Sequence, residues 1–441
     1  MKHHLQNATC GVLDYAAYPL GMIAAAPLLI RGLGATHFGI WAFTMAGINT
    51  GAILASGFGD ANIQQIAVAR GVNDIARVES CVRTTLGIHL LLGALLTVAA
   101  YLAAPFAARH VVSTENDVRL CTTSLQIGSF CVLLRALETV VVSTQRAFER
   151  YAESIHISAT MRVLSLAVAT ILGLRGAEVP TVVASSAALL SLGTLAQFVR
   201  LTTFLPTRCL IPSYERKAGR SLLRLGMFTW LQATAGAVFG QADRLFVGIA
   251  FGAVAVGAYS LCIQLAQPIA GVAASAFHFI FPMLARTGAG RQSRIARPLI
   301  LAFACNVLLV TTAALILLFC GGHLLRVWTT PAVAHAGGAI LPVVVLASAL
   351  AGLAVTGIYA MLALGKAVPV VTVTLLSGLA MLFSLGGFIH RFGILGVAAS
   401  RLLFGVTSLA IYIPLGWVLR GRAAANGTTT ALELGGAEGG A

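Results

Sequence analysis

The chain has 441 residues, of which 58% are hydrophobic and only 10% are charged, and its mean hydropathy is +0.90. A water-soluble protein of this length needs a charged and mixed surface, which this composition cannot supply. The formal net charge is +15, but the basic residues stand singly between apolar runs, which argues against a nucleic-acid partner. We therefore predict an all-α integral membrane protein.

A membrane-spanning helix needs about 20 mostly apolar residues, because its backbone groups find no water in the bilayer core. The sequence holds twelve such runs, at 12–31, 38–58, 82–104, 118–143, 155–174, 179–201, 222–249, 254–282, 296–320, 339–363, 367–388 and 393–419. The segment 421–441 is rich in Gly, Ala and Thr and has no apolar period. We expect it to be a disordered cytoplasmic tail.

Lys and Arg are distributed unevenly between the two sides of the predicted spans. Most of the 29 basic residues fall in loops on the side of the N-terminus, above all in the long basic segment 202–221. The positive-inside rule then places both termini in the cytoplasm, which requires an even number of spans. The expected location is the bacterial inner membrane.

One short motif occurs twice, at an offset close to half the chain length. Leu33-Gly34 followed by Phe38-Gly39-Ile40-Trp41 has the same spacing as Phe251-Gly252 followed by Val256-Gly257-Ala258-Tyr259. Each copy follows the first helix of a group of six. This predicts two parallel six-helix repeats, related about an axis along the membrane normal. The expected organisation is an N-terminal bundle at 1–201, a basic cytoplasmic linker at 202–221 and a C-terminal bundle at 222–420.

Eight cysteines are scattered without a CxxC pair or a Cys/His cluster at metal-ligand spacing. The sequence also has no nucleotide-binding loop, no paired carboxylates at catalytic spacing and no nucleophile constellation. We therefore expect no metal site, no catalytic residues and no cofactor. The chain is not expected to be an enzyme.

Three segments resemble oligosaccharide flippases, the Wzx-like polysaccharide-biosynthesis branch of the multidrug/oligosaccharidyl-lipid/polysaccharide (MOP) flippase superfamily, which also holds MATE drug exporters and lipid II flippases. They are Arg31-Gly-Leu-Gly-x3-Phe-Gly, Gly57-x-Gly59 through Arg70, and Trp230 through Gln241-Ala-Asp243-Arg244 into Val256-Gly257-x-Tyr259. The resemblance implies a V-shaped, MATE-like bundle whose halves open a central cavity alternately to either side. Members of the lipid II type usually carry two further helices, which are not found in this sequence.

The same resemblance implies an undecaprenyl-diphosphate-linked oligosaccharide repeat unit as cargo, moved across the membrane for O-antigen or exopolysaccharide assembly. The expected partners are this lipid-linked substrate and membrane lipids, with a polysaccharide polymerase of the same pathway as a further candidate. The alternative function is a MATE-like cation-coupled multidrug exporter. An exporter of cationic drugs would need acidic groups in its cavity, whereas the charge within these spans is mostly Arg.

Ionisable residues within the spans are the main candidate functional residues, because each costs about 2.5–3.5 kcal/mol near the bilayer centre. A guanidinium can bind phosphate oxygens in a bidentate manner, and polar amides can bind sugar hydroxyls. The candidates for the substrate cavity are Arg31, Asn49, Arg135, Arg162, Gln241, Arg244, Gln264 and Arg401. The candidates for ion coupling are Asp14, Glu138 and Asp243.

Some of these residues have a simpler structural interpretation. Arg135 and Glu138, three residues apart on one helix face, are expected to pair with each other, and Asp243 is expected to pair with Arg401. Arg162 has no acidic partner on its own predicted span and is therefore the best candidate for the cavity.

Three further candidates lie near helix ends. Arg31 and Arg244 can extend their side chains to the outer headgroups, and Asp14 can cap the first helix.

Overall fold

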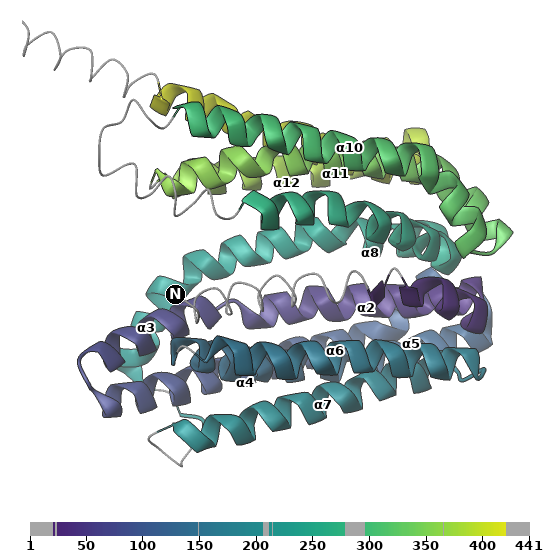
Figure 1. The fold of residues 1–441 in the computed structure, drawn as a ribbon. Helices are drawn as coiled ribbons and strands as arrows, with labels where there is room; N and C mark the ends of the chain where they lie inside the picture. Colours follow the sequence, from purple (N-terminus) through teal and green to yellow (C-terminus); the bar gives the residue numbers. More distant parts are fainter. Residues whose placement is uncertain are drawn as a thin grey trace, which may run out of the picture. The chain divides into compact units, whose positions relative to one another are not determined.

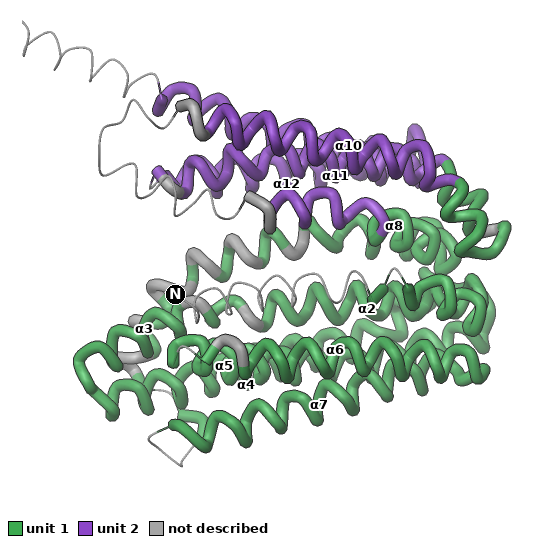
Figure 2. The backbone as a smooth tube through the Cα atoms, in the orientation of Figure 1, with its two compact units in different colours: residues 1–264, 323–338 green, residues 265–322, 339–441 purple. Residues whose placement is uncertain are grey.

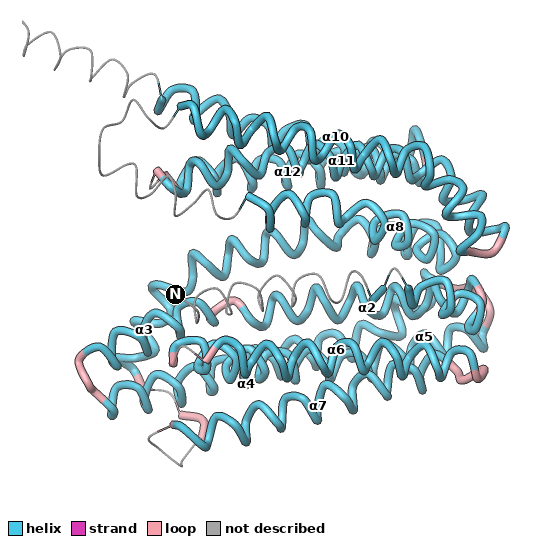
Figure 3. Tube along the Cα trace, viewed as in Figure 1, coloured by secondary structure: helices cyan, strands magenta, loops and turns pink. Residues whose placement is uncertain are grey.

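A computed structural model describes residues 21–419, apart from 23, 149, 206–210, 214, 278–295 and 365. Its architecture is shown in Figure 1. The described residues form helices joined by short loops, and no strand occurs among them, as Figure 3 shows. The prediction of an all-α protein is therefore confirmed.

The helices follow one another in the order α2 (Ala35–Ser56), α3 (Gly59–Gly71), α4 (Ile75–Val111), α5 (Glu115–Ala147), α6 (Tyr151–Leu174), α7 (Val179–Phe204), α8 (Arg216–Phe277), α10 (Ala296–Trp328), α11 (Pro331–Ala363), α12 (Ala367–Phe392) and α13 (Ile394–Ser408), with the 3-10 turn η2 (Leu409–Ile411) after α13. Local sequence explains several of the boundaries. The side chain of Asp74 accepts a hydrogen bond from the backbone N of Arg77 at 3.0 Å and so caps α4. Pro180 lies in the first turn of α7, where its missing N–H costs nothing.

Ten of the described helices are long and apolar enough to cross a membrane. One of them, Thr234–Ala274 within α8, overlaps both the seventh and the eighth predicted spans, and the shorter apolar helix Ala24–Leu33 overlaps the first. The prediction of about twelve spans therefore agrees with the structure. The helix α3 was not predicted, because its residues are much less apolar than those of the spans and fall in a predicted loop.

The turn within α8 is tighter than predicted. Only Gly252, with φ 81° and ψ −179°, departs from helical backbone where the sequence suggests a short loop. In a straight helix Asp243 and Tyr259 would lie about 24 Å apart, yet the Tyr259 hydroxyl donates a hydrogen bond of 2.8 Å to the Asp243 carboxylate. The chain therefore folds back on itself at one glycine, and α8 consists of two adjacent arms.

Backbone conformation repeats at the positions that the sequence repeat relates. The described glycines with positive φ are Gly34, Gly176, Gly252 and Gly393. Gly34 (φ 81°, ψ 166°) and Gly252 adopt nearly the same conformation and are the matched glycines of the motif. Gly176 follows α6 and Gly393 follows α12, which are the fifth spans of the two predicted groups. Two independent pairs of matched turns thus support the internal repeat.

The chain divides into two compact units, coloured in Figure 2. The first unit comprises residues 1–264 and 323–338, and the second comprises 265–322 and 339–441. In the first unit α5 packs against α2, α3, α4 and α7 and is its central helix. In the second unit Asn306 of α10 donates hydrogen bonds to Gly352 O (3.0 Å) and Thr356 Oγ1 (2.9 Å) of α11.

We predict that Gly34→Ala lowers the free energy of unfolding by about 1–3 kcal/mol, because a residue with a Cβ is strained at this φ and ψ. An added Cβ at Gly34 would meet no atom within 4 Å, so the loss would report backbone strain and not a clash. Gly47→Ala in α2, which is equally uncrowded, is the control and should leave stability unchanged or slightly raised. Thermal unfolding of the purified protein in detergent measures both, and equal melting temperatures would contradict the prediction.

Candidate functional site

The buried carboxylate of Glu138 lies deep in the central helix of the first unit. Glu138 is nine residues from the end of α5 at Ala147, which corresponds to about 13 Å along the helix axis. Its side chain is 10% exposed. A carboxylate at this depth needs protein partners, because the surrounding lipid offers none.

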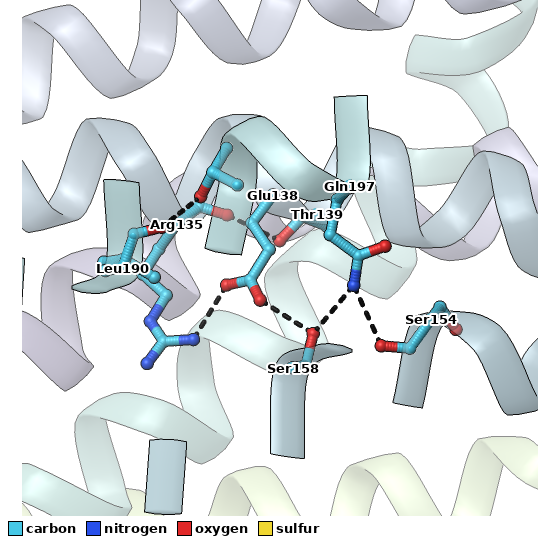
Figure 4. Close-up of polar contacts among 8 residues, drawn as sticks. Arg135, Glu138, Thr139, Ser154, Ser158, Leu190 and Gln197 are labelled. Atoms are coloured by element: carbon cyan, nitrogen blue, oxygen red, sulfur yellow. Dashed lines mark hydrogen bonds and ion pairs between the residues drawn. The ribbon is translucent and has the colours of Figure 1, made fainter. Parts of the chain in front are cut away.

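Glu138 has partners on both of its oxygens, as Figure 4 shows. Arg135 Nη1 donates to Oε2 at 2.7 Å, which confirms the pairing expected from the i, i+3 spacing. Ser158 Oγ of α6 donates to Oε1 at 2.9 Å. The Arg135 side chain remains 30% exposed, so that its guanidinium is only partly used by this pair. The carboxylate is therefore satisfied, while the cation keeps the capacity for further hydrogen bonds.

Two buried glutamines extend the network to the next helices. Gln197 Nε2 of α7 donates to Ser158 Oγ at 3.2 Å and to the Ser154 carbonyl at 2.9 Å. Gln145 Nε2 of α5 in turn donates to Gln197 Oε1 at 2.6 Å. These contacts join α5, α6 and α7 through polar groups that are largely hidden from solvent and lipid. The network thereby fixes the register of the three helices around Glu138.

Helical geometry places Arg162 close in depth to Arg135. Ser158 and Arg162 are four residues apart on α6 and share one face, and Ser158 contacts Glu138. Because α5 and α6 run in opposite directions, Arg135 and Arg162 both lie one turn from the Glu138–Ser158 hydrogen bond, on the side away from the α5–α6 connection. That turn is about 4–6 Å along each axis. The guanidinium groups of Arg135 and Arg162 and the Glu138 carboxylate therefore lie at a similar level of the bundle.

The predicted residues around Asp243 form a second cluster. Asp243 is fully buried, and its carboxylate accepts hydrogen bonds from Tyr259 Oη and from the backbone N of Arg244, both at 2.8 Å. Arg244 Nη1 donates to Gln241 Oε1 at 3.2 Å on the same helix. Asp243 and Arg401 belong to different units, so that their expected pairing stays a prediction.

The remaining described candidates lie on helices other than α5, α6 and α7, which form the Glu138 network. Arg31 is exposed and its Nη2 donates to the Val327 carbonyl at 3.1 Å, and Asn49 is exposed on α2. Gln264 is half-buried on α8, and its Oε1 has no hydrogen-bond partner among the described residues. Arg401 is half-buried on α13 of the second unit. Asp14 lies outside the described residues.

Several site residues were not found from the sequence. Gln145, Ser158, Gln197 and Tyr259 join the two clusters through contacts between helices or helix arms, which no local spacing reveals. The only available signal was the presence of two glutamines within or beside apolar runs. In the part of the chain that the structure describes, no group of three or more His, Cys, Asp or Glu side chains is arranged to hold a metal ion.

The long apolar helices and the buried charges define a multi-pass membrane protein with a polar site inside its N-terminal helices. Over residues 8–288 the sequence matches the family of polysaccharide biosynthesis proteins. The chain belongs to this family. A search among curated proteins found no match.

Solved transporter structures share the fold of the chain at low sequence identity. An inward-facing multidrug resistance MATE family transporter of the MOP superfamily superposes with a TM-score of 0.73 and 14% identity, over 95% of this chain and 99% of the other. The lipid II flippase MurJ, in an inward closed conformation, gives a TM-score of 0.72 and 12% identity, over 92% and 86%. A MOP superfamily transporter from Pyrococcus furiosus gives 0.64 and 15%, over 96% of each chain. The predicted MATE-like fold is thus confirmed.

We predict that the Arg135–Glu138 pair is energetically coupled. Glu138→Leu should lower the free energy of unfolding by about 1–3 kcal/mol, because it leaves the guanidinium and the Ser158 hydroxyl without their acceptor. Adding Arg135→Met should restore part of that loss, since the double variant buries no unpaired charge.

Thermal unfolding of the two single variants, the double variant and the wild type measures the coupling. Glu178→Leu, which removes an exposed carboxylate at the start of α7, is the control and should have little effect. Strictly additive losses in the double variant would show that the pair is not coupled.

Proposed function

We propose that the chain is a flippase that moves an undecaprenyl-diphosphate-linked oligosaccharide repeat unit across the bacterial inner membrane by alternating access. Its termini would lie in the cytoplasm, and its product would supply the assembly of a surface polysaccharide such as O-antigen or exopolysaccharide. The observation that carries the proposal is that Arg135 and Arg162 lie at a similar depth. They do so inside a membrane-embedded helix bundle of a polysaccharide biosynthesis protein.

The guanidinium groups of Arg135 and Arg162 suit an anionic lipid carrier. A diphosphate presents several oxygens with delocalised negative charge, and a guanidinium can bind two of them in one plane. Arg135 is oriented by Glu138 but remains partly exposed, and Arg162 lies one helical turn from Ser158 on the same face. In the proposed mechanism the two arginines bind the diphosphate, while Glu138, Ser158 and Gln197 hold Arg135 in position.

An exporter of cationic drugs is less well supported by the same residues. Such a protein needs acidic groups that can face the drug. Glu138 is already paired with Arg135 and hydrogen-bonded to Ser158, and Asp243 is fully buried against Tyr259. Because transport by a flippase involves no bond cleavage, the chain is proposed to act without catalysis, with a polymerase that consumes the exported unit as its partner.

We predict that Arg162→Ala abolishes export of the polysaccharide while the protein still inserts into the membrane at normal levels. The physical reason is the loss of a guanidinium that binds the diphosphate. Arg175→Ala, which removes an exposed arginine after the end of the same helix, is the matched control and should export normally. Surface polysaccharide and membrane-inserted protein are quantified together in cells that depend on the plasmid-borne variant.

A deletion strain distinguishes the two candidate functions. A flippase predicts that lipid-linked repeat units accumulate at the inner leaflet when the protein is absent. Unchanged lipid-linked intermediates together with altered sensitivity to cationic drugs would contradict the proposal and favour the exporter. Normal export by the Arg162→Ala variant would remove Arg162 from the proposed site.

A further inference from the structure

Arginine and phenylalanine side chains alternate at the end of the first unit where α3, α5 and α7 end and α6 begins. The guanidinium group of Arg70 lies 4.4 Å from the centre of the Phe148 ring, and that of Arg150 lies 4.5 Å from the centre of the Phe204 ring. The two rings are in contact, with centroids 5.2 Å apart. Arg70 Nη1 also donates a hydrogen bond of 2.6 Å to the Ala147 carbonyl. We call these two arginines and two phenylalanines the Arg–Phe row.

Glu153 of α6 connects the Arg–Phe row to α7. Its Oε1 lies 3.2 Å from Arg150 Nη1, and its Oε2 lies 3.3 Å from Arg200 Nη2. One carboxylate thus contacts two guanidinium groups. The side chains of Arg150 and Arg200 remain 41% and 50% exposed, and each guanidinium carries more N–H donors than this contact uses. Both arginines therefore keep the capacity to bind a further acceptor.

Positive charge exceeds negative charge at this surface. The charged side chains joined by these contacts are Arg70, Arg150, Glu153 and Arg200. The neighbouring sequence adds one charge of each sign, Arg146 and Glu149, of which Glu149 lies outside the described residues. Ring stacking on Phe148 and Phe204 orders two of the guanidinium groups in advance, which lowers the entropy cost of binding an anion.

The surface lies at the level of the lipid headgroups. The apolar segments of these helices that can cross a membrane are Glu115–Ala147, Glu153–Leu174 and Val179–Phe204. The charged groups therefore lie at or just beyond the ends of three spans, where arginine side chains can reach the phosphates of the adjacent leaflet. The distribution of Lys and Arg predicts that this end faces the cytoplasm.

We propose that the Arg–Phe row, together with Glu153 and Arg200, is a binding site for the phosphate of an anionic phospholipid in the leaflet at this end of the bundle. Guanidinium groups bind phosphate oxygens through charge-assisted hydrogen bonds. Because Arg150 and Arg200 approach the same carboxylate, one phosphate can contact both. A zwitterionic lipid gains less here, because its ammonium group offsets the attraction.

The proposed lipid site is separate from the candidate transport site. Ala147, next to the row, is nine residues from Glu138 on α5, which corresponds to about 13 Å along the helix axis. An acidic protein would complement the same charges, but the position at the ends of the spans favours a lipid. The proposal does not rest on the flippase function.

The test is native mass spectrometry of the purified full-length protein with phosphatidylglycerol and phosphatidylethanolamine of the same acyl chains. The wild type should prefer phosphatidylglycerol. The double variant Arg150→Gln/Arg200→Gln should bind this lipid more weakly, by about fivefold for each arginine removed. Arg119→Gln, which removes an exposed arginine near the opposite end of α5, is the matched control and should keep the preference.

A Glu153→Gln variant distinguishes a lipid site from an ion-pair cluster with a purely structural role. Loss of the carboxylate frees Arg150 and Arg200 for a phosphate, so that the affinity for phosphatidylglycerol should rise. A purely structural cluster would lose stability and gain no affinity. Because all three side chains are at least one third exposed, these variants are expected to fold, and thermal unfolding checks this.

Three results would overturn the lipid site. The first is equal binding of the two lipids by the wild type, or an unchanged preference in the double variant. The second is displacement of phosphatidylglycerol by an equal concentration of inorganic phosphate, because the site would then take a free anion. The third is a poly-Glu peptide that binds the wild type but not the double variant, without any lipid preference, which would assign the surface to an acidic protein.

Discussion

The absence of water from the bilayer core is the constraint on which the rest of this structure depends. Each polar group placed there must find its hydrogen-bond partners within the protein. Asn62 of α3, fully buried beside the ends of the spans, is satisfied in the same way, because its Nδ2 donates to Ser143 Oγ (2.8 Å) and Thr144 Oγ1 (3.1 Å) of α5, and its Oδ1 accepts from Thr85 of α4 (3.0 Å). Such contacts connect helices at defined registers. In the first unit several of these contacts involve α5, which carries Glu138 and also Ser143 and Thr144, the partners of Asn62.

The same constraint gives the charged residues their significance. A single buried carboxylate would be costly, but Glu138 is satisfied by Arg135 on one oxygen and by Ser158 on the other. A second cation, Arg162, lies at a similar depth on α6. Two guanidinium groups at one depth can bind phosphate oxygens, which is why we propose a phosphate-containing lipid carrier.

Sequence alone predicted the spans well and the site only in part. The apolar runs predicted the helices because burial in lipid depends on composition over about 20 residues. The Arg135–Glu138 pair was predictable because both residues lie on one helix. The contact of Glu138 with Ser158 depends on how α5 and α6 pack, and local spacing carries no information on that packing.

The central claim is that Arg135 and Arg162 form a diphosphate site, and direct binding tests it most simply. Native mass spectrometry of the purified protein can compare undecaprenyl diphosphate with undecaprenyl monophosphate. The account predicts that the wild type prefers the diphosphate, because two guanidinium groups can share its oxygens, and that Arg162→Gln loses this preference while retaining binding of the monophosphate. Equal preference for the diphosphate in the wild type and in Arg162→Gln would contradict it.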